Sequence, residues 1–252
     1  MKNLKTDRFN LVAAGILAFS ALASSSAHAA LVTGNATITI DKTVFAGTSN
    51  GWDIPKFFDA SYNKVAINGS TLGGSTSTTN MLFSVNSNSS TISYGAVNRS
   101  LQKTTMDSTD TSTGQIGLSG ALTMSNPSLG NLAPYDFSLQ KYSGTWNLVT
   151  HDQFFGGTTF LQLTNVLESV DANGHLALAG DLIWGNNFGS TTYPSFLGLT
   201  WASFLNVPAE NRSTLVGHLS LAAVPVPAAV WLFGSGLLGL LGVARKKAAV
   251  AA

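Results

Sequence analysis

Apolar and polar residues alternate one by one over most of the chain between positions 30 and 223. In the stretch LVTGNATITI, Ala36, Ile38 and Ile40 fall on one face, and asparagine and threonine fall on the other. Side chains of a strand point alternately to its two faces, so this period of two predicts strands with one buried and one solvated face. Such strands are typical of antiparallel sheets.

Further segments repeat this pattern. Their predicted core positions are Ile116, Leu118, Leu122 and Met124; Tyr135, Phe137 and Leu139; Trp146 and Leu148; and Leu215, Leu219 and Leu221. The clearest hairpin turns at Asp171-Ala172-Asn173-Gly174, where Asn-Gly supplies the positive φ of a tight turn. After the turn, the positions predicted to share a buried face are Leu176, Leu178, Leu182 and Trp184. We therefore expect an all-β body over residues 30–223, an antiparallel β-sandwich or jelly roll.

Four segments depart from the alternation. The low-complexity stretches 68–79 (NGSTLGGSTSTT) and 106–114 (MDSTDTSTG) are predicted loops, because they offer too few apolar groups to offset the entropy of ordering. The aromatic stretch 50–58 (NGWDIPKFF) also reads as a loop. Residues 192–207 have apolar residues at near-helical spacing and could carry a short helix.

The composition limits the classes of partner. Only 10% of the 252 residues are charged, and serine, threonine, asparagine and glycine take their place. Six of the 13 basic side chains but one of the 12 acidic ones lie at the two ends, which leaves the body with 7 basic and 11 acidic residues and a net charge of −4. A body of this kind has no electrostatic attraction for nucleic acid. The chain has 0 cysteines, which excludes disulfides and thiolate chemistry.

The N-terminus has the features of a secretory signal peptide. A basic beginning is followed by an apolar run from Leu11 to Ala23 and by the small-residue site Ala27-His28-Ala29. This order is the one that signal peptidase recognises, and it predicts an N-terminal signal helix over residues 1–29 with cleavage after Ala29. The body is then exported.

The C-terminus has the features of a transmembrane helix. Residues 228–244 contain no charged side chain, and as a helix they would span about 25 Å, slightly less than a hydrocarbon core of roughly 30 Å. Arg245, Lys246 and Lys247 follow, and positive residues stay on the cytoplasmic side. The body is therefore expected on the opposite side of the inner membrane. Just before this helix, Pro225 and Pro227 predict an extended, exposed segment.

Together these C-terminal features resemble the PEP-CTERM sorting signal of Gram-negative bacteria: the motif V-P-x-P, an apolar helix and a short basic tail. The match runs from Val224 to Lys247, with Val226 in place of the usual middle glutamate. The resemblance implies an inner-membrane intermediate recognised by an exosortase, a membrane-embedded cysteine transpeptidase. The enzyme would cut near the proline motif and pass the body to the cell surface or to the extracellular, exopolysaccharide-containing matrix of a biofilm. Residues 224–252 form the predicted sorting tail.

The histidines give little indication of catalysis or of a metal site. His151 and Asp152 are adjacent, and neighbours on a strand point to opposite faces, so we interpret the pair as a polar strand end. His175 and Asp181 are six residues apart on one strand, about 20 Å, and His218 is predicted to face solvent. No catalytic residue, transition-metal site or other cofactor is therefore predicted.

Two acidic turns leave calcium as an open alternative. Asp171-x-Asn173-Gly174 and Asp107-x-x-Asp110 each match part of a calcium loop, but both lack the remaining oxygen ligands and the closing glutamate. We interpret both as turns. Weak calcium binding across several loops is the alternative, because extracellular modules use such sites.

The best candidate for ligand contact is the stretch around Trp52 and Asp53. An exposed tryptophan could stack on a sugar ring, whereas Trp146 and Trp184 occupy predicted core positions. These observations favour an exported, non-enzymatic surface or matrix protein whose polar, weakly charged sheet contacts exopolysaccharide.

Two alternatives remain open. One is a surface enzyme acting on polysaccharide, which would need two carboxylates roughly 5–10 Å apart. The available acids are Asp53, Asp59, Asp136, Asp152 and Asp181. The other alternative is a β-domain that keeps its C-terminal membrane anchor uncut.

Overall fold

The computed structural model describes residues 31–59, 74–86, 91–94, 97–151, 157–172, 174–185 and 200–222. The predicted signal peptide, with Ala27 and Ala29, lies outside these residues. So does the predicted sorting tail, with Val224–Pro227, the helix 228–244 and Arg245–Lys247. Within the described ranges, no helix combines the length and the hydropathy needed to cross a membrane.

Strands dominate the described part of the chain. Its elements are β1 (Asn35–Ile40), α2 (Lys42–Thr48), β2 (Asp53–Phe58), β3 (Met81–Val85), β4 (Thr91–Tyr94), β5 (Val97–Ser100), β6 (Ile116–Asn126), β7 (Gly130–Leu132), β8 (Tyr135–Tyr142), β9 (Thr145–Thr150), β10 (Thr158–Val170), β11 (Leu176–Ile183), α3 (Trp201–Phe204), a 3-10 turn η1 (Ala209–Asn211) and β12 (Leu215–Ala222). The all-β prediction is confirmed.

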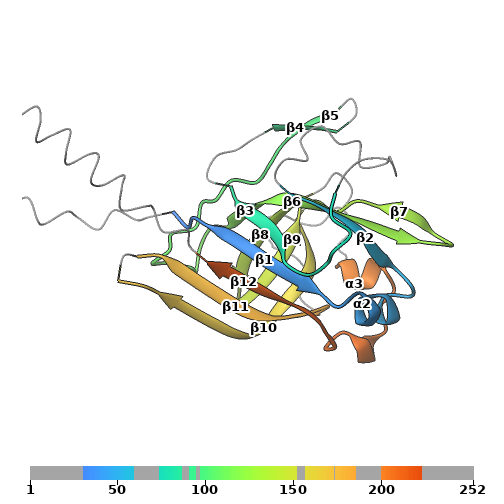
Figure 1. Ribbon diagram of the computed structural model, residues 1–252. Coiled ribbons are helices and arrows are strands. Elements are labelled where there is room, and N and C mark those ends of the chain that lie inside the picture. The colour runs from blue at the N-terminus through green and yellow to red at the C-terminus, as the bar shows by residue number, and fades with distance from the viewer. Residues whose placement is uncertain are drawn as a thin grey trace, which may run out of the picture.

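Eight of the strands close into an antiparallel barrel. The order around the barrel is β1, β3, β6, β8, β9, β10, β11 and β12, and β12 pairs with β1 to complete it. Strands β2 and β7 extend the sheet beside β6, and β4 and β5 form a separate hairpin. In Figure 1 the strands β1, β12, β11 and β10 lie on the near side, with β8 and β9 behind them.

The closed order differs from the predicted sandwich or jelly roll, which the structure does not confirm. A sandwich has two separate sheets, whereas here each strand of the barrel pairs with the next barrel strand along the chain and the last returns to the first. The alternation of apolar and polar residues could not decide between the two, because both architectures bury one face of each strand. What distinguishes the barrel is the pairing of β1 with β12, the first and last strands of the described body. The local sequence of neither strand identifies its partner.

The interior of the barrel is filled by apolar side chains from every wall. Cross-strand pairs such as Ile38 with Leu219, and Leu139 with Leu148, place buried side chains on the same inner face. Aromatic rings form a chain through the core, with centroid distances of 5.4 Å from Phe83 to Phe137 and 5.6 Å from Phe137 to Phe160. Tilted and edge-on ring pairs of this spacing add to the stabilisation from burial. The inner face is therefore a packed core.

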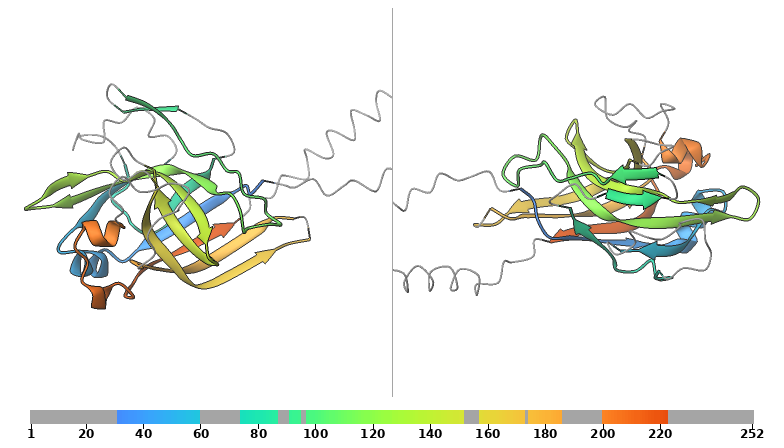
Figure 2. Two further views of the ribbon diagram at one scale, coloured as in Figure 1. Left: turned by 180° about the vertical axis from the view of Figure 1, so that it is seen from behind. Right: turned by 90° about the horizontal axis from the view of Figure 1, so that it is seen from above.

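One end of the barrel, which we call the helix end, is closed by α2 and α3 (Figures 1 and 2). Asp41 caps α2, since its carboxylate accepts from the N–H groups of Thr43 and Val44, both at 3.0 Å. The helix places Phe45 with its ring centroid 4.6 Å from that of Trp184. At α3, the ring of Trp201 packs against that of Phe160, with 5.5 Å between the ring centroids.

The opposite end, which we call the tail end, is where β1 begins and β12 ends. Asn35 and Ala222 are direct partners there, so the two ends of the described body leave from neighbouring strands. Val32 and Met106 are buried at this end, and the Val32 N–H donates to the Met106 carbonyl at 3.2 Å.

Two local predictions are wrong. The stretch predicted as a loop at positions 50–58 contains strand β2, which pairs with β6. The register shifts between Asp53 and Lys56, so Pro55, which has no N–H to donate, lies in the irregular part. Leu215 was predicted to be buried, but it is 45% exposed. A bulge where Ile183 pairs with Leu215 turns the Leu215 side chain to the face opposite that of Leu219.

The other predicted core positions on the described strands are confirmed, although polar positions between them on β8 and β9 are buried as well. The other predicted core positions in β6, β8, β9, β11 and β12, and Trp184 just beyond β11, are buried. The β10–β11 hairpin turns where expected, with Gly174 at φ +80°. The predicted helix between 192 and 207 is present as α3, although residues 192–199 lie outside the described part.

Candidate functional site on the outer wall

The outer face of β3, β1, β12, β11 and β10 carries mostly small side chains in register across the sheet. One row runs Leu82, Thr37, Ser220, Ala179, Leu167, and the next runs Thr39, His218, Asp181, Thr164. We call these nine residues the outer wall. Their chain neighbours Ile38, Leu219 and Leu178 are buried in the barrel, so the strict alternation of the sequence directs the wall residues outward.

A short polar network gives the wall its single carboxylate. Asp181 accepts from Asn165 Nδ2 at 2.8 Å, and its other oxygen lies 2.8 Å from Nδ1 of His218 on the next strand. The hydrogen bonds from Asn165 and His218 hold the pKa of Asp181 below its ordinary value, against an opposing effect of desolvation. The carboxylate is therefore ionised at neutral pH and already has hydrogen-bond partners.

The wall suits an uncharged, hydroxyl-rich ligand better than a charged one. Thr37, Thr39 and Ser220 present hydroxyl groups, which both donate and accept hydrogen bonds. The wall carries neither lysine nor arginine, the side chains that form the strongest charge-assisted hydrogen bonds with phosphate or carboxylate.

On the opposite outer face, β8 and β9 bring a serine and a histidine together. Ser138 Oγ lies 2.8 Å from Nε2 of His151, the contact that a nucleophile makes with its base. Gln140 Nε2 also lies 3.1 Å from the same ring nitrogen and donates to Ser138 Oγ at 2.8 Å. Ser138 is 0% exposed and His151 is 8% exposed, so a substrate has no direct approach to the hydroxyl.

The buried pair is part of a larger structural network. Gln140 donates to Gln115, and Gln115 donates to Gln102, both at 2.9 Å. The backbone N–H of Gln102 then donates to Asp136 Oδ1 at 2.6 Å. Tyr142 donates to Gln140 Oε1. The network fastens the segment after residue 100 onto β6 and β8, and this segment forms part of the cover that buries Ser138.

Gly117 allows the segment around Gln102 to lie directly against β6. A Cβ atom at this position would lie 2.0 Å from the carbonyl oxygen of Gln102, which no real contact allows. The N–H of Gly117 donates to Thr104 Oγ1 at 3.1 Å, so the covering segment is bonded to the strand beneath it. Here glycine is required by contact with another part of the backbone.

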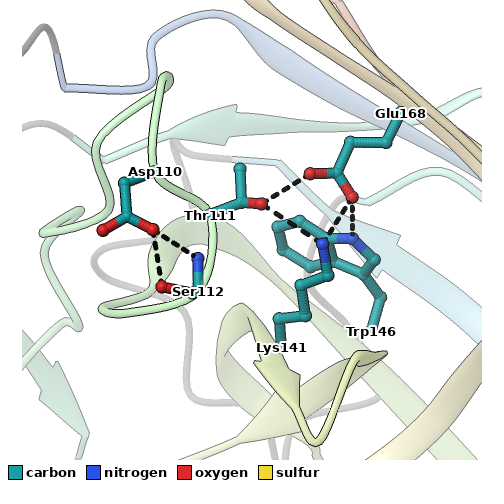
Figure 3. A network of polar contacts seen from close by, with 6 residues as sticks. All are labelled: Asp110, Thr111, Ser112, Lys141, Trp146 and Glu168. Carbon is teal, nitrogen blue, oxygen red and sulfur yellow. Dashed lines mark hydrogen bonds and ion pairs between the residues drawn. The ribbon is translucent and has the colours of Figure 1, made fainter.

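At the tail end, a second network joins four chain segments (Figure 3). Glu168 accepts from Lys141 Nζ at 2.8 Å, from Trp146 Nε1 at 2.9 Å and from Thr111 Oγ1 at 2.5 Å. We call Glu168 and these three donors the tail-end network. Partial burial raises the pKa of Glu168, but the hydrogen bonds from Lys141, Thr111 and Trp146 outweigh this effect, so its pKa lies below the usual value.

The predicted contact residues have different environments. Trp52 is only 3% exposed, so its ring belongs to the core and is not available for sugar stacking. Asp53 lies on β2, and its carboxylate is 3.4 Å from Lys42 Nζ. Trp146, Trp184 and Trp201 are also buried. Stacking of Trp52 on a sugar ring required an exposed side chain, and the structure does not meet this condition.

The acids considered for catalysis or calcium are held in separate contacts. Asp53 pairs with Lys42, Asp136 with Gln102, and Asp181 with His218. Asp59 is exposed after β2, and Asp152 lies outside the described residues.

The acidic turns make local contacts. Asp107 and Asp110 accept from Thr109 and Ser112 within their own turns, and Asp171 accepts from the N–H of His175. Figure 3 shows the Asp110 turn. Across the described ranges, no three side chains of the metal-binding types come together.

Comparison of the chain with protein-family models, curated proteins and solved structures gave no significant match. The function is therefore inferred from the sequence and from the geometry described above.

The sequence reasoning missed the burial of polar residues on β8 and β9. Ser138, Gln140 and Asn147 occupy positions that alternation assigns to solvent, yet all are buried. Their cover includes the segment around Gln102, more than 30 residues away from Ser138 in the chain. No local signal could have indicated this contact.

Proposed function

We propose that this chain is an exported, non-enzymatic protein that an exosortase delivers to the cell surface or to the extracellular matrix of a Gram-negative bacterium. The observation that carries the proposal is the segment from Val224 to Lys247, with its V-P-x-P motif, uncharged apolar run and basic end. Signal peptidase acting after Ala29 completes the processing.

The geometry of the tail end supports this role. The last residue of β12, Ala222, pairs with Asn35 and lies two positions before the motif. All described core residues lie between Val32 and Leu221. Cleavage at the motif would therefore release a body that retains its described core.

We propose further that the outer wall is the surface that contacts the matrix. Its hydroxyl groups can exchange hydrogen bonds with sugars and water, and its low charge gives little repulsion toward acidic polysaccharide. The body has a net charge of −4, so placing the contact on an almost uncharged face matters for association with a polymer of like sign.

Mass spectrometry of the mature protein tests the sorting step. We expect a mature C-terminus near Val224–Pro227, and we expect the double variant Pro225→Ala, Pro227→Ala to remain in the membrane fraction. Pro127→Ala, in the exposed β6–β7 turn, is the matched control and should be processed normally. A mature protein that still ends at Ala252 would show that the tail is an uncut anchor.

Retention by matrix isolated from the host tests the contact surface. Ser220→Glu places a carboxylate at the centre of the outer wall, and retention should fall several-fold. Ser128→Glu adds the same charge at an exposed position away from the wall and should have no effect. Equal retention of both variants and the parent would contradict the proposed surface.

A further inference from the structure

The outer wall contains one histidine, a side chain that can gain a charge near neutral pH. His218 lies on β12, the middle strand of the wall, between Thr39 of β1 and Asp181 of β11. Its side chain is 61% exposed, whereas that of Asp181 is 29% exposed. Histidine is the residue type that ordinarily changes its charge between about pH 5 and about pH 8. The charge that the wall presents to a ligand therefore depends on this residue.

The contact with Asp181 determines how the ring can bind. Nδ1 of His218 lies 2.8 Å from Oδ1 of Asp181. Hydrogen bonds from Asn165 and His218 lower the pKa of Asp181, so this carboxylate is ionised at neutral pH and can only accept. Nδ1 must then carry the hydrogen of this bond. Among the described residues Nε2 has no hydrogen-bond partner, so Nε2 is the ring nitrogen left for a ligand.

Protonation changes what Nε2 offers to a ligand. In the neutral ring Nε2 accepts a hydrogen bond, which suits the hydroxyl group of a sugar. In the charged ring Nε2–H donates a hydrogen bond, which suits the oxygen of a carboxylate. The Nδ1–H group donates to Asp181 in both states. The change in binding character therefore needs no rearrangement of the wall.

Hydroxyl groups flank the ring on the same face of the sheet. Thr39 is the direct partner of His218 on β1, and Ser220 follows two positions later on β12. Neighbouring strands lie roughly 4.8 Å apart, and alternate residues of one strand lie roughly 6.8 Å apart. A saccharide bound at Nε2 is therefore within reach of both hydroxyl groups, which can bond to its other oxygens.

The strands packed against β12 bring few charges toward His218. On β11 the charged group is Asp181, and beyond it β10 contributes the uncharged Thr164 and Asn165. On the other side, the carboxylate of Asp41, just after β1, accepts from the first N–H groups of α2. The wall thus carries one negative charge while His218 is neutral and no net charge once His218 is protonated.

We infer that His218 makes the outer wall a binding site for acidic polysaccharide whose affinity rises as the surroundings become acidic. The charged ring donates through Nε2–H to a sugar carboxylate, while Thr39 and Ser220 bond to hydroxyl groups of the same polymer. At neutral pH only contacts of the hydroxyl type remain. The inference rests on the proposed role of the wall and adds which polymer it binds and under which condition.

Binding of the purified protein to two immobilised polymers tests the inference. Polygalacturonate has a carboxylate on each sugar unit, and dextran, which has none, is the neutral comparison. From about pH 8 to about pH 5 at fixed ionic strength, the protein should bind polygalacturonate about threefold to fivefold more tightly, the range of one exposed ion pair. Its binding to dextran should not gain from acidification.

Two histidine variants assign the effect to its residue. His218→Gln keeps an amide hydrogen for Asp181 but cannot gain a charge, so the increase at acidic pH should disappear. His175→Gln is the matched control, because Nδ1 of His175 also contacts an aspartate, at 3.0 Å from Asp171 Oδ2, but at the β10–β11 turn. This variant should behave as the parent. No increase in the parent, the same increase in His218→Gln, or an equal loss in both variants would overturn the inference.

Retention by host matrix separates this inference from the proposed contact surface. If Ser220→Glu reduces retention near neutral pH while His218→Gln keeps the increase at acidic pH, the wall is the contact surface and the role given to His218 is wrong. If Ser220→Glu has no effect on retention but the increase on polygalacturonate requires His218, the site binds acidic polymer and the proposed matrix contact is wrong.

Nitrogen NMR of the imidazole rings gives a measurement that does not depend on retention. The neutral ring of His218 should carry its hydrogen on Nδ1. At about pH 5, addition of an oligogalacturonate should shift the Nε2 signal of His218 and leave that of His175 in place. A neutral ring with its hydrogen on Nε2, or equal shifts of the two histidines, would contradict the geometry on which the inference depends.

Discussion

Burial keeps His151 uncharged among its polar neighbours. Desolvation lowers its pKa from 6.5 to about 4, so the ring is neutral at physiological pH. Neutral Nε2 is the atom that Ser138 and Gln140 approach. The residue therefore contributes to the packing of β8 and β9 as an uncharged hydrogen-bonding group.

This burial predicts a dependence of stability on pH. Between pH 6.5 and about 4 the unfolded chain binds the His151 proton and the folded chain does not, so the free energy of unfolding falls as pH is lowered through this window. The full effect corresponds to about 3 kcal/mol. Urea unfolding at several pH values should show that His151→Gln removes this slope while His175→Gln retains it. The same slope in both variants would contradict the assignment.

Glu168 gives a second prediction at the residue scale. Its lowered pKa means that its stabilising contribution is present above the ordinary glutamate pKa and is lost as pH falls through the folded value. Glu168→Gln should destabilise the body by about 1 kcal/mol at pH 7, because the ion pair with Lys141 is lost and the amide oxygen can still accept. The exposed Glu210→Gln is the control in the same urea titration, and an equal loss there would show that the tail-end network adds nothing.

At the scale of elements, two glycines have opposite roles. Gly47 lies inside α2, where an added methyl group would have no atom within 4 Å, whereas Gly174 holds the β10–β11 turn at φ +80°. Gly47→Ala should stabilise the protein by about 0.5–1 kcal/mol through helix propensity. Gly174→Ala should destabilise it by about 1 kcal/mol, because left-handed backbone is costly for alanine. Thermal unfolding should move in opposite directions, and shifts of the same sign would contradict the prediction.

The sequence predicted elements best where one strand face is wet and the other is dry. In β1 the alternating positions Ala36, Ile38 and Ile40 are buried as expected. The alternation in β8 correctly predicted a strand. It wrongly predicted that the polar face would be exposed, because β8 is buried on both faces. Strand β2 was missed because Pro55 and the bulge interrupt its pattern.

At the scale of the whole molecule, the contact of β1 with β12 holds the barrel closed. Six residue pairs, from Asn35 with Ala222 to Ile40 with Gly217, form this seam. The seam joins the first and last strands of the described body, and no pattern within either strand identifies its partner. The closed topology was therefore beyond the reach of local sequence reasoning.

The seam predicts where the chain tolerates truncation. Removal of residues 224–252 should leave the unfolding temperature of the body within about 2 °C, because no described core residue is lost. Removal of residues 215–252 deletes β12 and opens the barrel, and cooperative unfolding should disappear. Circular dichroism melts of the two truncated proteins make the comparison. A cooperative transition in the shorter protein would show that β12 is dispensable.

The sequence predicted the chemical character of the candidate site but not which residues form it. A polar, weakly charged sheet follows from composition and alternation, and the outer wall has this character in Thr37, Thr39 and Ser220. The grouping of these residues with Asp181 and Leu167 required the register of five strands. Trp52 was considered as a contact residue because its local sequence does not indicate that its side chain is buried in the core.

The seam also has a consequence for the order of folding. Synthesis proceeds from the N-terminus, so β1 is made first and β12 last. The hairpins from β8 to β11 can form while the chain is still growing, because their partners are close in sequence. One edge of β1 must wait until its partners Gly217 to Ala222 have been made, and during that time it is an open template for wrong pairing. A ribosome that stalls before residue 215 would leave β12 unmade and the earliest edge still uncovered.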